Sequence, residues 1–219
     1  MAMATIYLVR FDDPSFVQTS RPPRTRSKAH QSHSSADGPE NIGPKLKVDD
    51  FSRDDGQLGT GPGGTWEARA GGWTIRNGQA QGEPRSPDEL ALATLTVAGI
   101  NTRSAVRLPK PEAGTGLAFR VSSSQNYWLA SVNPATANIT VHRIENGTAV
   151  AVGTTAAAEV GPDMKLGVTA QAGQIEVTVN GTPVGRFEDP TPNGSGVGIG
   201  RAPGGSQGLT FDDFEYEVL

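Results

Sequence analysis

The sequence predicts an all-β fold in which two antiparallel sheets form a sandwich, preceded by an extended N-terminal arm. Two observations lead to this prediction. Short segments rich in β-branched and aromatic residues recur after residue 46, about one every 12 residues, which is the spacing typical of two-sheet sandwiches. The chain of 219 residues also contains 28 glycines and 16 prolines, which form turns and disfavour long helices.

The first 46 residues differ from the rest, so we divide the chain into an arm at 1–46 and a sandwich at 47–219. The arm is polar and interrupted by proline, and it lacks the apolar residues needed to fold alone. Residues 4–11 have the composition of a strand that adds to the sheet edge of a neighbouring chain. We therefore expect the arm to bind a partner protein, through Tyr7, Arg21, Arg24, Arg26 and Lys28. Its positive charges are too few to predict nucleic-acid binding.

Fourteen candidate strands follow the arm in the order 47–51, 65–69, 72–76, 89–97, 102–108, 116–122, 126–132, 138–144, 148–153, 165–170, 174–179, 182–187, 196–201 and 209–218. Three of them end at Asn-Gly pairs, at Asn77, Asn146 and Asn180. Both residues of such a pair tolerate positive φ, which a tight hairpin turn requires. Within 174–180 the apolar residues alternate with polar ones, which predicts one buried face and one wet face. Around Asp212 and Asp213 the alternation slips by one residue, which indicates a bulge.

Several classes of site are excluded or disfavoured by composition. The chain has no cysteine and three histidines, so disulfides, thiol catalysis and cysteine-based zinc sites are excluded, and we expect no cofactor. The start of the chain lacks the pattern of an export signal, and no stretch approaches the length of an apolar membrane span. We therefore expect a protein with no membrane partner and no signal peptide.

Residues 49–80, DDFSRDDGQLGTGPGGTWEARAGGWTIRNGQA, resemble the opening of bacterial and phage domains of the concanavalin A-like, or laminin G-like, jelly-roll superfamily. TGLAFRVSSSQNYWLASV, IEVTVNGTPVGRF, GVGIG and FDDFEYEV are similar to later strands of that family. The resemblance covers residues 47–219 and implies a jelly-roll sandwich whose last strand pairs beside the first. It fixes no activity, because the superfamily includes glycosidases, lectins, adhesion modules and virion proteins.

Large aromatic residues are assigned by their need for burial. We expect Trp66 and Trp73 in the core or at its rim, with a partner for each indole N–H. Tyr127 and Trp128 are adjacent in a strand and so point to opposite faces; we expect one in the core and the other on a sheet surface. A glycan-binding site would then consist of the exposed aromatic ring with hydrogen-bonding neighbours, drawn from Arg120, Gln125, Asn126, Tyr127 and Trp128.

Carboxylates near the first and last strands form a candidate calcium site. If these strands pair, Asp49, Asp50, Asp212 and Asp213 could approach one end of the sandwich, and calcium prefers such oxygen ligands. The alternative is that these carboxylates cap backbone N–H groups in turns. No EF-hand spacing is present, and calcium is the weaker interpretation.

Three functions remain open. The resemblance and the arm favour a non-enzymatic structural protein of a virus particle, a bacteriophage minor tail or virion-surface protein located in the virion, bound to other virion proteins and touching host glycans. The first alternative is a carbohydrate-binding module or lectin. The second is a glycan-active enzyme, which the sequence disfavours because it lacks the Glu-x-Asp-x-x-Glu strand of the sandwich glucanases and any other pair of facing carboxylates.

Overall fold

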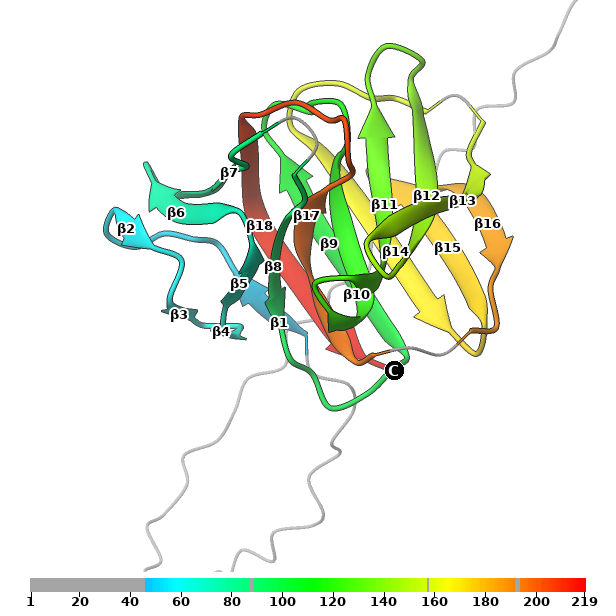
Figure 1. The fold of residues 1–219 in the computed structure, drawn as a ribbon, viewed down its shortest axis with the longest axis horizontal. Coiled ribbons are helices and arrows are strands. Elements are labelled where there is room, and N and C mark those ends of the chain that lie inside the picture. Colours follow the sequence, from blue (N-terminus) through cyan, green and yellow to red (C-terminus); the bar gives the residue numbers. More distant parts are fainter. Residues whose placement is uncertain (1–45, 87–88, 157, 192–193) are drawn as a thin grey trace, which may run out of the picture. The chain divides into compact units, whose positions relative to one another are not determined.

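The computed structural model describes residues 46–86, 89–156, 158–191 and 194–219, and none of these residues lies in a helix. Two antiparallel sheets stack face to face (Figure 1). The predicted all-β sandwich is therefore confirmed. Within the same ranges there is no helix long and apolar enough to cross a membrane.

The first sheet has nine strands. In spatial order they are β16 (Thr182–Glu188), β15 (Gln174–Val179), β14 (Met164–Gln171), β9 (Thr102–Leu108), β18 (Leu209–Val218), β7 (Gln79–Glu83), β6 (Gly72–Arg76) and β2 (Gly56–Gln57), with β1 (Lys47–Asp49) paired to β18. The pairing of β1 with β18 places Asp49 opposite Phe214. The first and last strands thus pair, as the family resemblance implied.

The second sheet has seven strands, all antiparallel. In spatial order they are β13 (Thr148–Thr154), β12 (Asn138–Glu145), β11 (Asn126–Asn133), β10 (Thr115–Ser123), β17 (Gly196–Arg201), β8 (Ala91–Leu95) and β5 (Glu67–Ala70). A small hairpin of β3 (Thr60–Gly61) and β4 (Gly64–Thr65) lies outside both sheets. The strands absent from the sequence prediction are β2, β3, β4 and β7; three of these contain only two residues.

Local sequence signals account for the turns. Asn77, Asn146 and Asn180 all have φ near +50°, and each is followed by a glycine with positive φ. They close the hairpins β6–β7, β12–β13 and β15–β16. The register of β18 shifts against β9 between Asp212 and Glu215, at the predicted bulge. These predictions are confirmed.

The main core lies between the two sheets and contains most of the buried apolar side chains, including Trp66, Trp73 and Trp128. Alternation along β15 buries Ile175, Val177 and Val179, as predicted. Trp73 donates its indole N–H to the carbonyl of Ala70 at 2.9 Å. Both tryptophans expected in the core are therefore there.

A buried carboxylate organises the segment that follows β1. Asp49 is fully buried and accepts hydrogen bonds from the Phe51 backbone N–H (3.0 Å), Arg53 Nη1 (2.7 Å) and Trp66 Nε1 (2.7 Å). A Cβ at Gly61 would lie 2.1 Å from Asp49 Oδ2, so only glycine fits there. We call Asp49, Phe51, Arg53 and Trp66 the Asp49 node.

Aromatic rings extend this node into the core. The Trp66 and Phe214 ring centroids lie 5.0 Å apart in an edge-on arrangement, and Phe51 lies 5.6 Å from Trp66. The Tyr216 hydroxyl donates to the carbonyl of Gly63 at 3.0 Å. Polar and apolar contacts together therefore fix residues 51–66 against β18.

A second apolar cluster lies on the seven-stranded sheet, separate from the main core. It consists of Leu92, Ala118, Val121, Tyr127, Leu129, Ile144 and Ala202. His142 on β12 pairs with Leu129 on one side and Ala151 on the other, and burial lowers its pKa. His142 therefore favours its neutral form in the folded protein.

Loss of the Asp49 carboxylate should destabilise the protein. In Asp49→Ala, Arg53 and Trp66 lose their shared acceptor inside the protein, and we expect the free energy of unfolding to fall by about 3 kcal/mol. Asp50→Ala is the matched control, because Asp50 is exposed and accepts one backbone N–H, from Ser52. Urea denaturation measures both. Equal effects of the two substitutions would contradict the role of the Asp49 node.

The stability of the sandwich should depend on pH through His142. Its folded-state pKa is lowered, so the unfolded chain binds more protons just below pH ~6.5, and stability falls as pH decreases from that value. The slope for one proton cannot exceed about 1.4 kcal/mol per pH unit. His142→Gln should flatten the dependence of the urea midpoint on pH across this range, compared with wild-type protein. An unchanged slope in His142→Gln would refute this assignment.

Candidate functional site

The residues predicted to bind a partner through the arm, namely Tyr7, Arg21, Arg24, Arg26 and Lys28, lie outside the described residues. The arm therefore stays a prediction from sequence.

The predicted glycan residues do not form one exposed surface. Tyr127 and Trp128 point to opposite faces, as expected, but both are fully buried, so the expectation that one ring is exposed is wrong. Trp128 belongs to the main core and Tyr127 to the second cluster. Asn126 lies at the start of β11, where its side chain accepts the Asn146 backbone N–H. Of the remaining two residues, Arg120 is buried and Gln125 is exposed.

Arg120 and Trp128 instead belong to a second buried carboxylate site. Asp189 Oδ2 accepts hydrogen bonds from Trp128 Nε1 and Arg143 Nη1, each at 3.1 Å. Arg120 donates to the Asp189 carbonyl at 2.9 Å, and its guanidinium lies 5.7 Å from the Trp128 ring centroid. Burial alone would raise the pKa of Asp189, but hydrogen bonds from Thr191 and Trp128, with the charge of Arg143, hold that pKa below its usual value. We call Asp189, Trp128, Arg143 and Arg120 the Asp189 node.

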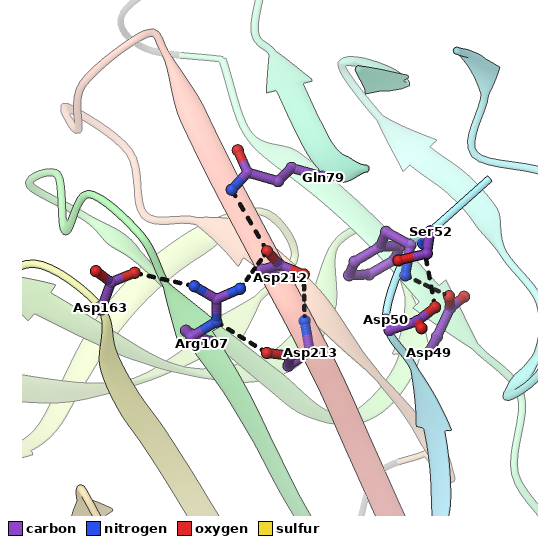
Figure 2. A network of polar contacts seen from close by, with 9 residues as sticks. Asp49, Asp50, Ser52, Gln79, Arg107, Asp163, Asp212 and Asp213 are labelled. Carbon is purple, nitrogen blue, oxygen red and sulfur yellow. Dashed lines mark hydrogen bonds and ion pairs between the residues drawn. The ribbon is translucent and has the colours of Figure 1, made fainter. Parts of the chain in front are cut away.

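The four carboxylates proposed for calcium fall into two separate groups (Figure 2). Asp49 accepts hydrogen bonds from Arg53 and Trp66, and Asp50 accepts one from the Ser52 backbone N–H. Asp212 and Asp213 lie on β18 beside Arg107 instead. In the described part of the chain, no three His, Cys, Asp or Glu side chains are arranged to hold a metal ion. The four aspartates are thus not brought together, and calcium binding stays a prediction from sequence.

Arg107 on β9 binds three carboxylates. It donates to Asp163 at 2.9 Å, to Asp213 at 2.8 Å and to Asp212 at 2.5 Å (Figure 2). Its hydrogen bond to Asp213 contributes most to raising the pKa of Arg107. Burial raises the pKa of Asp212, against the opposing charge of Arg107. We call Arg107 with these three aspartates the Arg107 cluster.

A hollow of about 380 Å³ lies on the polar face of the nine-stranded sheet, across β18, β9, β14 and β15. Its lining includes Ala105 and Gly167, which are register partners on β9 and β14, and Thr178, which pairs with Gly167 from β15. Because these adjacent positions carry small side chains, the surface is depressed there. A Cβ at Gly167 would lie 2.3 Å from the Thr178 hydroxyl oxygen, so the glycine makes room for this hydroxyl. We call this site the Gly167 hollow.

Three ion pairs lie at the Gly167 hollow; two join adjacent strands, and the pair of Lys165 with Glu215 joins β14 to β18 across β9. Lys165 binds Glu215 at 2.7 Å and Arg103 binds Glu217 at 2.6 Å. On the opposite side, Arg186 binds Glu176 at 2.6 Å. Each cation keeps further N–H donors and each carboxylate keeps further acceptor positions. The pairs therefore present oriented donors and acceptors beside the Thr169 and Thr178 hydroxyls, which is chemistry suited to a polar, uncharged ligand.

Sequence reasoning did not find this hollow. Its residues come from four strands that are distant in sequence, and only the strand order brings them together. The one signal available was alternation, which placed Glu176 and Thr178 on the wet face of their strand.

No family model and no curated protein matches the sequence. Among solved structures, the chain is similar to the carbohydrate binding module CBM66 from Bacillus subtilis, at 18% identity and a TM-score of 0.52, over 73% of this chain and 96% of that one. The GH43 protein BlXynB from Bacillus licheniformis is similar at 18% identity and a TM-score of 0.56, over 79% of this chain and 39% of that one.

A protein of unknown function with a galectin-like fold, from Bacillus subtilis, is similar at 12% identity and a TM-score of 0.51, over 69% of this chain and 88% of that one. This chain thus spans about two fifths of the BlXynB chain and most of the other two. At these identities the likeness shows the fold alone. The sandwich has the jelly-roll architecture of these proteins.

Proposed function

We propose that the sandwich is a non-catalytic carbohydrate-binding module and that the Gly167 hollow holds the sugar. The observation that carries the proposal is the hollow itself, a depression of about 380 Å³ surrounded by three ion pairs and two threonine hydroxyls. Sugar hydroxyls are both donors and acceptors, so they match groups of both kinds. The fold supports this proposal by analogy, since one similar structure is named as a carbohydrate binding module.

The carboxylates of the Gly167 hollow are poorly placed for glycoside hydrolysis. That reaction needs a protonated acid and a second carboxylate facing it across the scissile bond. Here Glu176, Glu215 and Glu217 are each ion-paired with the side chain of an arginine or a lysine, so none of them faces another carboxylate as its partner. This arrangement favours binding over catalysis.

The virion assignment stays a prediction from sequence. It rests on the resemblance to phage proteins and on the arm, and none of the three similar structures described above adds support to it. Carbohydrate binding is compatible with it, because a virion-surface protein can bind host glycans through the same hollow.

Filling the Gly167 hollow should abolish glycan binding without unfolding the protein. Thr169 lies on the polar face of β14 and lines the hollow. In Thr169→Trp the indole would occupy the sugar position, and tryptophan is well tolerated in strands. We expect at least a tenfold loss of affinity, measured by isothermal titration calorimetry with the neutral oligosaccharides that wild-type protein binds on a glycan array.

Thr148→Trp is the matched control, because Thr148 is exposed on β13 of the other sheet. It should bind as wild-type protein does, and both variants should keep the wild-type urea midpoint. Unchanged affinity in Thr169→Trp would exclude the Gly167 hollow as the site. The absence of any glycan bound by wild-type protein would reject the proposed function.

A further inference from the structure

A second hollow, also of about 380 Å³, lies on the nine-stranded sheet. Its lining includes Gln81 on β7 and Thr210 on β18, which are register partners, together with Lys110, Glu112 and Gly208. We call it the Thr210 hollow. None of the sites described above uses it.

The two hollows lie in line on one face of the sheet. The Gly167 hollow includes Glu215 of β18, and the Thr210 hollow includes Thr210 of the same strand. These residues are five positions apart, but the bulge between Asp212 and Glu215 adds one residue to β18, so both side chains lie on the same face of the sheet. Along the strand the two positions are separated by roughly 13 Å, at about 3.3 Å for each of four residues. The Arg107 cluster lies between them, because Asp212 and Asp213 fall between Thr210 and Glu215 and Arg107 pairs with Asp212.

The charges along this line disfavour an anionic ligand. Each cation that lines a hollow, or lies between them, already binds a carboxylate: Lys110 with Glu112, Arg107 with its three aspartates, Lys165 with Glu215 and Arg103 with Glu217. Carboxylates therefore outnumber cations in these contacts. A uronate or a phosphate would compete with existing partners and meet a net negative surface.

We propose that the two hollows are subsites for one extended, neutral oligosaccharide, which crosses the Arg107 cluster. This inference rests on the proposed function and adds the length and charge of the ligand. A single sugar ring cannot reach both hollows, so affinity increases with chain length until both are filled. The polar groups of the cluster, including the Gln79 amide that donates to Asp212, contact the middle of the chain.

The test measures affinity against chain length. Isothermal titration calorimetry is performed with cello-, xylo- and fructo-oligosaccharides from the disaccharide to the hexasaccharide, and with oligogalacturonides of the same lengths. The variant Gly208→Phe fills the Thr210 hollow; a Cβ at Gly208 meets no atom within 4 Å, and its φ is not in the left-handed region. Thr148→Trp is again the control.

We expect wild-type protein to bind the hexasaccharide of one neutral series at least tenfold more tightly than the disaccharide, and to bind oligogalacturonides at least tenfold more weakly. Gly208→Phe should lower the affinity for the hexasaccharide to about that for the disaccharide, whereas Thr169→Trp should weaken binding at every length. Length-independent binding that Thr169→Trp still abolishes would overturn this inference and leave the proposed function intact. Tighter binding of oligogalacturonides would also overturn it. Binding of no oligosaccharide at any length would overturn both.

Discussion

The hydrogen bond between a buried aspartate and an indole N–H is the interaction on which the two-sheet arrangement depends, and it occurs twice. Asp49, on β1 of the nine-stranded sheet, binds Trp66, which immediately precedes β5 of the seven-stranded sheet. Asp189 follows β16 of the nine-stranded sheet and binds Trp128 on β11 of the other. A carboxylate removed from water is costly unless every partner is present, so each node permits only one position of its tryptophan.

The arginines complete these nodes. Arg53 binds Asp49 and also donates to the carbonyl of Leu58 at 2.7 Å, while Arg143 binds Asp189. Each aspartate thus neutralises a cation at the same point where it orients an indole. Within residues 49–53, Asp49, Phe51 and Arg53 contact one another, and Asp49 and Phe51 also contact Trp66. Asp49 thus belongs to the buried contacts that hold this segment in place.

Features that depend on neighbouring residues in the sequence were predicted correctly. Features that depend on which strands lie side by side in the sheets were not. Asn-Gly pairs and alternation along β15 require only neighbouring residues, so hairpins and buried faces followed from them. Adjacency correctly placed Tyr127 and Trp128 on opposite faces. It could not indicate that the second face is also buried, because its apolar cluster draws on β8, β10, β11 and β12 together. The Gly167 hollow was missed for the same reason, since its strands meet only through the sheet order.

Along the strands of the nine-stranded sheet, the residues that form the core alternate with the residues that line the Gly167 hollow. Val106, Val168 and Val177 point into the core, whereas Ala105, Gly167 and Thr178, their neighbours in sequence, point to the other face. Small residues in the hollow therefore leave core packing intact. The ion pairs around the hollow are partly exposed, and such pairs contribute only about 0–1 kcal/mol to stability. Their donors and acceptors are consequently available to a ligand at little cost to the fold. The buried nodes differ, because their carboxylates each accept a hydrogen bond from a tryptophan of the opposite sheet or of the segment that precedes it.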